Sequence, residues 1–142
     1  MNIINGVDNI MEWITGKKRS VADSYIRISA GTIGNDILIC LEGGTKPHIG
    51  CVVQAVPRPS LTGDGSGSAT ASVLNLTGHK DEYLCRKLAE KICGSLGRVT
   101  VCTGGFHLDG IIKEQIKEVM EVVEQMSEEI LQELEKSFKN II

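Results

Sequence analysis

The chain has 142 residues, of which 42% are hydrophobic and 23% are charged, and its formal net charge is −3. This balance predicts one domain over residues 1–142 and excludes a disordered chain or a small scaffold that depends on cross-links. Residues 111–139 hold eight Glu and four Lys, so the remainder carries about +1. Such a small excess provides no basic stripe of the kind that nucleic acid requires.

The cysteines and the beginning of the chain indicate a cellular compartment. The five cysteines are odd in number and form no Cys-x-x-Cys pair; they are Cys40, Cys51, Cys85, Cys93 and Cys102. Because each lies in an apolar stretch, we expect buried thiols in a reduced protein. No basic segment leads into an apolar one near residue 1, and no apolar run approaches ~18 residues. A cytoplasmic protein without membrane contact is therefore expected.

Strands are predicted for the first half of the chain, after a polar lead over residues 1–22. Apolar residues alternate or run together in four stretches, and a Gly34-Asn35-Asp36 turn separates the first two. Such a pattern is typical of antiparallel hairpins. Residues 57–71 are expected to form a loop or a hairpin tip. The four predicted strands, which follow one another in antiparallel order, are 24–31, 35–42, 48–56 and 72–77.

Two helices and one further strand are predicted for the second half. Asp81 is a candidate N-cap for a helix that ends near Gly94 or Gly97. One apolar stripe on this helix consists of Leu84, Cys85, Leu88, Ala89, Ile92 and Cys93. Residues 98–103 read as a strand and residues 111–139 as a long helix. The predicted fold class is α+β: an antiparallel β-meander followed by β-α-β-α, with a short helix and a long C-terminal helix packed on the sheet.

The long helix allows two interpretations. Its apolar stripe consists of Ile112, Ile116, Val119, Val123, Met126, Ile130 and Leu134. This stripe favours packing on the chain's own sheet, and Glu133 interrupts it. The spacing is also heptad-like, which leaves a contact with a second copy as the alternative. A homodimer therefore stays open.

The three histidines each lie beside glycines, in GGTKPHIG (His48), GHKD (His79) and GGFHLDG (His107). Antiparallel neighbours alternate in direction, and a helical crossover leaves its two strands parallel. By this parity, the strands that end near residues 42, 77 and 103 share one edge of the sheet. The three segments are therefore predicted to form a single site.

The residue types in this site suit a phosphorylated, partly aromatic small molecule. Glycines let a ligand approach the backbone, Lys46 and Lys80 can neutralise a phosphate, and Phe106 offers a stacking face. Helix N-termini predicted near Asp81 and Asp109 favour anions. The predicted ligand-binding residues are Gly43, Gly44, Lys46, His48, Gly78, His79, Lys80, Asp81, Gly104, Gly105, Phe106, His107 and Asp109.

Other chemistry is open at the same residues. The glycines can serve turn geometry alone, and loop histidines are often only solvated. His48, His79 and His107 could together bind a metal ion, although the chain has no compact His-x-x-x-His or Cys-x-x-Cys signature. A histidine beside a carboxylate can also act as a general acid or base. The Gly/Ser-rich segment GDGSGS is not a nucleophile elbow.

The ordered segments GGTKPHIG, GHKD and GGFHLDGI, with the βαβα tail, resemble the LpdD-like prenylated-flavin chaperone family over roughly residues 24–125. That family is also described as the small D subunit that accompanies gallate-type UbiD-like decarboxylases. The resemblance implies one LpdD-like domain, similar in fold to proteasome-assembly chaperones, that is not itself the decarboxylase and is more an accessory chaperone than an enzyme. It would bind or deliver prenylated FMN, a phosphorylated flavin, to a UbiD-like decarboxylase subunit.

The resemblance supplies no residue-level site, so the placement of the flavin rests on the residues alone. Lys46 and Lys80 are expected beside its phosphate and Phe106 beside its ring system. Two alternatives stay open beside this reading. One is a small metal- or histidine-dependent enzyme that acts on a phosphorylated metabolite, and the other is a scaffold that only assembles a complex.

Overall fold

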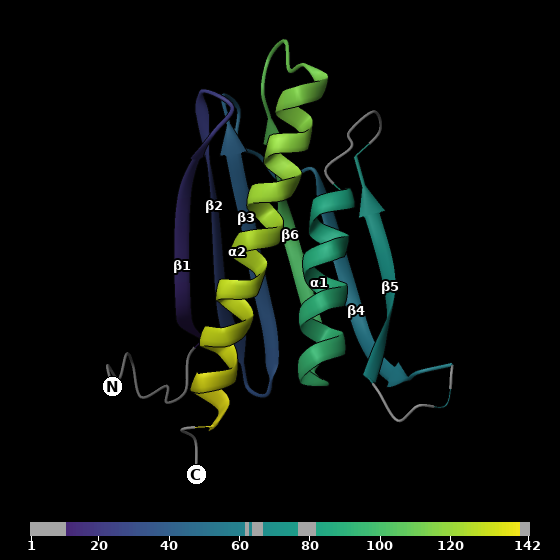
Figure 1. Cartoon of the computed structure of the whole chain (residues 1–142). Helices are drawn as coiled ribbons and strands as arrows, with labels where there is room; N and C mark the ends of the chain where they lie inside the picture. The colour runs from purple at the N-terminus through teal and green to yellow at the C-terminus, as the bar shows by residue number, and fades with distance from the viewer. Residues whose placement is uncertain (1–10, 62, 64–66, 77–81, 140–142) are drawn as a thin grey trace, which may run out of the picture.

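A computed structural model describes residues 11–61, 63, 67–76 and 82–139 of the chain. These residues form a mixed sheet with two helices (Figure 1). In chain order the elements are β1 (Glu12–Val21), β2 (Ser24–Ile33), β3 (Asp36–Gly44), β4 (Cys51–Pro59), β5 (Gly67–Asn75), α1 (Glu82–Leu96), β6 (Thr100–His107) and α2 (Lys113–Lys139).

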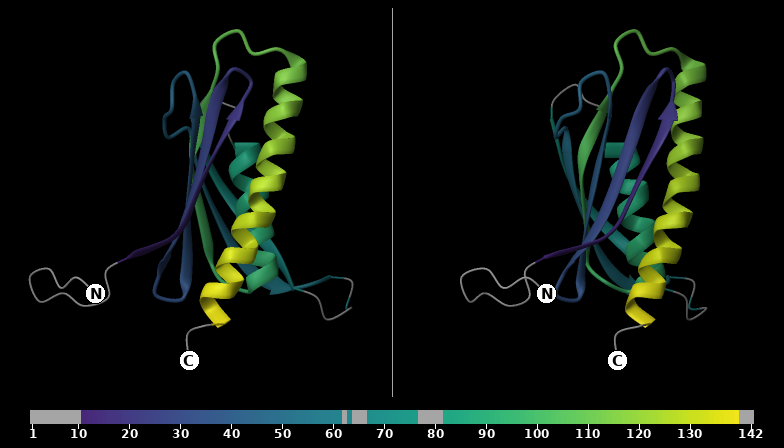
Figure 2. Two further views of the ribbon diagram at one scale, coloured as in Figure 1. Left: turned by 60° about the vertical axis from the view of Figure 1, so that its left-hand side comes forward. Right: turned by 90° about the vertical axis from the view of Figure 1, so that its left-hand side faces the viewer.

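The strands lie side by side in the order β1-β2-β3-β6-β4-β5. Only the β3–β6 pair is parallel among the described strands; the other neighbours are antiparallel. Both helices cover the same face of the sheet, and the opposite face is left open (Figure 2). The molecule therefore has two layers, and we call the uncovered side the open face.

The predicted α+β class is confirmed, with three differences in the strands. β4 and β5 include residues 57–59 and 67–71 of the segment that was expected to be a loop or hairpin tip. β1 lies inside the segment that was expected to be only a polar lead over residues 1–22. In addition, β6 enters the sheet between β3 and β4, so the expected run of four neighbouring strands is divided. One part is the β1-β2-β3 meander and the other is the β4-β5 hairpin. The division arises because the α1 crossover returns the chain to the centre of the sheet, next to β3.

The hydrophobic core lies between the sheet and the two helices. Alternate residues of β2 and β3 point into it, as the period of a strand requires. The buried face of α1 consists of the six residues expected from its periodicity. Burial of a Leu or Ile side chain stabilises the fold by ~1.5–3 kcal/mol. The largest side chains that are fully buried include Ile26, Ile28, Ile39, Leu41, Leu88, Ile92, Met126, Ile130 and Leu134.

The long helix α2 packs on its own sheet, as one of the two interpretations expected. Val119, Val123, Met126, Ile130 and Leu134 are buried. Ile112 and Ile116, at the start of the predicted stripe, are instead 56% and 45% exposed. Ile112 precedes α2, which begins at Lys113, and Ile116 lies in its first turn.

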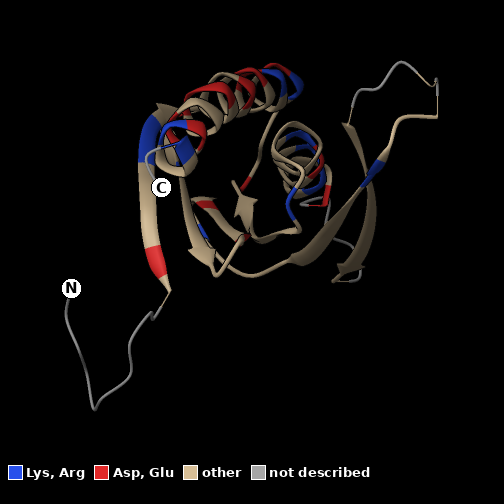
Figure 3. Cartoon of the chain, turned by 90° about the horizontal axis from the view of Figure 1, so that it is seen from below, with Lys and Arg blue, Asp and Glu red and all other residues tan. Residues whose placement is uncertain are grey.

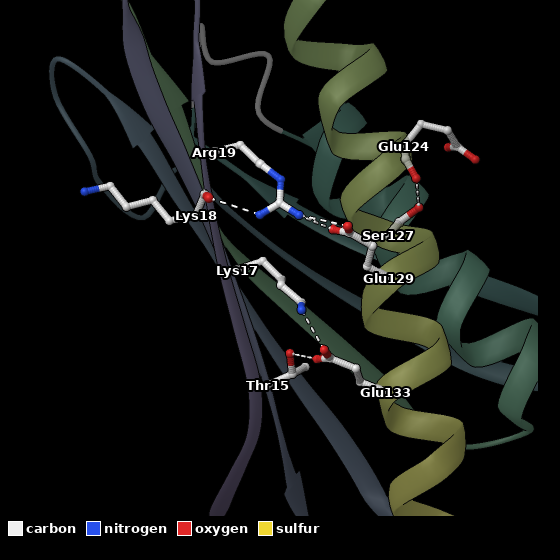
Figure 4. Close-up of polar contacts among 8 residues, drawn as sticks. All are labelled: Thr15, Lys17, Lys18, Arg19, Glu124, Ser127, Glu129 and Glu133. Atoms are coloured by element: carbon white, nitrogen blue, oxygen red, sulfur yellow. Dashed lines mark hydrogen bonds and ion pairs between the residues drawn. The ribbon is translucent and has the colours of Figure 1, made fainter.

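Polar contacts hold α2 against the edge strand β1 (Figure 4). Lys17 forms an ion pair with Glu133 at 2.6 Å, and Arg19 forms one with Glu129 at 2.6 Å. The hydroxyl of Thr15 donates a hydrogen bond to Glu133. The basic strand and the acidic helix lie side by side when the molecule is viewed along the strands (Figure 3). Thr15, Lys17 and Arg19 of β1 thus have charged partners on a helix that is far away in the sequence but adjacent in space.

The cysteines are free thiols, and four of the five are buried. Burial raises the pKa of the Cys93 thiol above its ordinary value. Cys40 is half-buried on the open face, where burial raises the pKa of its thiol, and the neighbouring Cys85 and Glu42 add to this effect. None of the helices in the described residues is long and apolar enough to cross a lipid bilayer.

Candidate functional site

The candidate site lies at one edge of the sheet, which we call the rim: the ends of β3, β5 and β6 at Gly44, Asn75 and His107 (Figure 1). β3 and β6 are parallel neighbours. β4 is antiparallel to both β6 and β5, so β5 runs in the same direction as β6. The prediction that these three strands end at one edge is therefore confirmed.

Hydrogen bonds join the loop after β3 to the end of β6. The backbone N–H groups of Thr45 and Lys46 both donate to the carbonyl oxygen of His107, at 2.7 and 3.3 Å. The hydroxyl oxygen of Thr45 accepts from the N–H of Asp109 at 3.5 Å. Two segments that are about 60 residues apart in sequence are thereby held in contact.

Two glycines allow β3 and β6 to approach so closely. Gly44 has a φ of +82°, and a Cβ atom there would lie 1.9 Å from the carbonyl oxygen of His107. Gly104 has a φ of +137°, and its Cβ would lie 1.7 Å from the carbonyl oxygen of Leu41. No side chain fits at either position. These glycines are required by the contact between the strands, whatever ligand the rim accepts.

The polar side chains at the rim form a cluster. Nε2 of His107 lies 2.9 Å from Oδ1 of Asp109, and Nζ of Lys46 lies 3.6 Å from the same oxygen. The hydrogen bond from His107, and then the positive charge of Lys46, lower the pKa of Asp109 below its ordinary value. The Lys46 and Asp109 side chains are 69% and 64% exposed, so water screens their ion pair and Lys46 can exchange its partner for an incoming anion.

His48 lies beside this cluster. Its ring centroid is 6.4 Å from that of His107, in an edge-on arrangement. Its Nδ1 lies 2.9 Å from the carbonyl oxygen of Lys46. Because a carbonyl only accepts, Nδ1 carries the proton in this bond. The two histidines predicted in the first and third segments are therefore neighbours.

A pocket of about 350 Å³ opens on the open face, next to the cluster. The loop after β3 forms one wall, and β2, β3 and β6 form the rest. Arg27 and Glu42, a weak pair at 3.4 Å, provide the charged part of the lining. We call it the rim pocket; its lining residues are Arg27, Ser29, Cys40, Leu41, Glu42, Pro47, His48, Ile49, Thr103 and Gly104.

The structure brings together many of the residues predicted for the site. His48 and Gly104 line the rim pocket. The others at the junction of β3 and β6 are Gly43, Gly44, Lys46, Gly105, His107 and Asp109. Gly43 and Gly105 are paired within the sheet, where they face Phe106 and Glu42 respectively.

Other predicted residues are placed elsewhere. Phe106 packs against the hydrophobic core and does not line the rim pocket. Asp109 is not at a helix N-terminus, because α2 begins at Lys113. The second segment, Gly78, His79, Lys80 and Asp81, lies outside the described residues.

Several lining residues were missed by the sequence reasoning. Arg27, Ser29, Cys40 and Glu42 occupy outward positions of β2 and β3, between buried apolar residues. Polar residues at every second position of a strand are usually only its solvated side. The polar-outward alternation was visible in the sequence, but the loop that turns it into a pocket was not.

Metal binding was an alternative for the three histidines. Within the described part of the chain, no group of three or more His, Cys, Asp or Glu is placed to hold a metal ion. His79, which that alternative used, is outside this part.

The fold is shared with a chaperone of known structure. A chain of a chaperone complex for yeast 20S proteasome assembly superposes with a TM-score of 0.51, at 17% sequence identity, over 87% of this chain and 98% of that one. At this identity the likeness concerns the fold alone.

Comparison by sequence identifies the family to which the chain belongs. The model of the prenylated flavin chaperone LpdD-like domain matches residues 20–135, and the chain belongs to this family. Protein LpdD of Lactiplantibacillus plantarum is 30% identical over 103 residues, which cover 70% of this chain and 69% of that protein. The resemblance seen in the three rim segments is thereby confirmed, and the chain is a chaperone-family protein.

Proposed function

We propose that the chain binds prenylated FMN at the rim pocket and delivers it to a UbiD-like decarboxylase, without transforming it. The observation that carries this proposal is the rim pocket itself, which lies between Arg27 and His48 and beside Lys46. Membership of a prenylated flavin chaperone family supports the choice of ligand.

The rim pocket suits the ring system of a flavin, and the cations in and beside it suit the phosphate. Its volume of about 350 Å³ lies at the lower end of the range for small-molecule sites. Pro47 and Ile49 supply apolar lining for a flat ring system. Lys46 and Arg27 supply the positive charge that a phosphate requires.

The cations at the rim are already engaged, but weakly. Arg27 and its partner Glu42 are 50% and 42% exposed, and their closest atoms are 3.4 Å apart. Exposed pairs of this kind contribute ~0–1 kcal/mol. An incoming phosphate can replace the carboxylate at little cost, and the carboxylate can replace the phosphate on release. A carrier needs this reversibility, because it must also give up its ligand.

The open face provides a surface for the decarboxylase beside the pocket. Val52, Val56 and Leu74 point outward there and are 37%, 45% and 75% exposed. Apolar side chains grouped on a surface often mark the contact with another protein. Docking on this face would put the enzyme directly over the bound flavin.

The test is to co-express the chain with a flavin prenyltransferase, purify it, and record its absorption spectrum and flavin content. Replacing Arg27 by Met should weaken flavin binding ~10–100-fold, because a hydrogen bond to a charged group contributes ~1.5–3 kcal/mol. The matched control is Arg58→Met. Arg58 lies near the far end of β4, where its Nε donates to Thr70 at 2.9 Å, outside the rim pocket.

The outcomes separate the proposal from its alternatives. Flavin retained by the wild-type chain and by Arg58→Met, but lost from Arg27→Met, supports the carrier function. Equal retention by both variants contradicts the placement in the rim pocket. A chain that never binds flavin but still binds the decarboxylase is a scaffold for assembly, and the proposal then fails.

A further inference from the structure

The two edge strands of the sheet differ in how they meet solvent. An exposed edge offers unpaired N–H and C=O groups to any other strand, and proteins usually protect it with charges, bulges or covering elements. β1 has all three forms of protection. It carries Lys17, Lys18 and Arg19, its register shifts between Trp13 and Thr15, and it contacts α2.

The opposite edge strand, β5, packs against α1 on the helix side of the sheet, but it lacks the charges and the register shift. Its sequence GSATASVLN contains no charged residue and no proline. It pairs with β4 from Gly67 to Asn75 without a register shift. No strand lies beyond it in the part of the chain that the structure describes. It is a long, regular and uncharged edge.

The hydrogen-bond pattern identifies which backbone groups of β5 point outward. The N–H of Leu76 donates to the carbonyl of Gly50 at 2.8 Å, and these two residues continue the register of the β4–β5 pair. Hydrogen-bonded and non-hydrogen-bonded pairs alternate along an antiparallel ladder. The backbone groups of Thr70, Ser72 and Leu74 therefore face β4. Those of the residues between them, Ala69, Ala71 and Val73, point away from the sheet.

We propose that β5 pairs antiparallel with β5 of a second copy, which joins the two six-stranded sheets into one sheet of twelve strands. A two-fold axis at Ala71 pairs all residues of β5 with their counterparts. Ala69 then faces Val73 of the second copy on the helix side, and Thr70 faces Ser72 on the open face. No like charges meet, and the two hydroxyl residues can bond across the junction.

A second copy fits this edge better than it fits the open face. The sequence of β5 is complementary to itself in the register centred on Ala71, as a two-fold contact requires. A copy packed on the open face would cover the rim pocket, whereas edge pairing leaves the pocket accessible in both copies. The inference does not depend on flavin binding.

The first test compares Val73→Pro with Val73→Ala by native mass spectrometry and sedimentation. Both variants replace the same half-buried side chain, but only proline removes the outward N–H, and it leaves the β4 ladder intact. The wild-type chain and Val73→Ala should sediment as dimers of the 15.3 kDa chain. Val73→Pro should weaken dimerisation at least about tenfold, since it loses outward hydrogen bonds and its ring blocks the approach of the second strand.

A second test changes two exposed side chains of β5, of which Thr70 accepts a hydrogen bond from Nε of Arg58 at 2.9 Å. The Thr70→Lys/Ser72→Lys variant and the Thr70→Glu/Ser72→Glu variant each place like charges opposite one another, so each should be monomeric. Their mixture should form a dimer, because lysine then faces glutamate at both positions. Circular dichroism of each variant shows whether it is folded.

Three results would overturn the proposal. One is a wild-type chain that stays monomeric at about 0.1 mM. Another is a dimer that survives both Val73→Pro and the charged variants, which would place the contact elsewhere, including on the open face. The third is a monomer whose β5 edge is needed only to bind the decarboxylase, which would make that enzyme the occupant.

Discussion

Replacing Gly44 by Ala tests the junction on which the site is built. Alanine at a φ of +82° costs ~1–2 kcal/mol in backbone strain alone. The new Cβ would also lie 1.9 Å from the carbonyl oxygen of His107, so β3 and β6 must separate there. Separation breaks the bonds from the N–H groups of Thr45 and Lys46 to that oxygen, each of ~1 kcal/mol. The expected loss in the free energy of unfolding is about 3–4 kcal/mol.

The assay is urea denaturation, with Gly34→Ala as the matched control. Gly34 has a φ of +60°, but no atom lies within 4 Å of its Cβ position. That variant pays the backbone cost of ~1–2 kcal/mol and nothing for a clash. The excess loss in Gly44→Ala measures the close approach of the strands. Equal losses in the two variants would refute the argument that the rim depends on this contact.

Three further predictions concern the helices and the polar cluster. Ile130→Ala should cost ~2–5 kcal/mol of stability, whereas Ile116→Ala, which is 45% exposed, should cost under ~1 kcal/mol; similar urea midpoints would contradict the packing of α2. Lys91→Met should lower the free energy of unfolding by up to ~1 kcal/mol, because Lys91 pairs with two carboxylates of α2 at 2.9 and 2.6 Å. The loss should be smaller in about 1 M NaCl, and a loss that grows with salt would exclude an ionic origin. His107→Leu, which removes the donor, should raise the pKa of Asp109, measured from its carboxyl ¹³C shift. In the wild-type chain this carboxylate stabilises the fold at higher pH and stops doing so as the pH falls through its lowered pKa. An unchanged titration would mean that His107 does not bond to it.

The helix faces could be predicted from the sequence because their period does not depend on what they pack against. All six buried residues of α1 followed from the 3.6-residue repeat. The stripe of α2 was right from Val119 onward, but Ile112 and Ile116 are exposed. Periodicity identifies the apolar side of a helix, but it does not reveal where the partner surface ends.

β1 could not be recognised because its sequence lacks the apolar alternation of a half-buried strand. Lys17 and Arg19 interrupt the pattern, and their partners Glu133 and Glu129 lie more than 100 residues away. A polar strand of this kind is stabilised by contacts that no local window contains. Its assignment required knowledge of where α2 lies.

The shared edge of the three strands could be predicted from the sequence, whereas the residues that line the rim pocket could be predicted only in part. Strand parity is a property of direction, so it gave the shared edge without the lateral order. The rim pocket depends on that order, since β6 must lie beside β3 for Thr103 to join Arg27 and Glu42. Phe106 was expected in a loop beside the ligand, whereas it lies in β6 and packs, partly buried, against the hydrophobic core.

The parallel pairing of β3 with β6 also determines when the rim can form during synthesis of the chain. β1 to β3 and β4 to β5 are local hairpins that can form as soon as they leave the ribosome. Residues 37–44 can pair with residues 100–107 only after most of the chain has been synthesised, and closing the long loop between them costs chain entropy. The two loops that hold the cluster of Lys46, His107 and Asp109 meet only in that step. A nascent or partly folded chain therefore cannot capture a ligand at this position before its own sheet is complete.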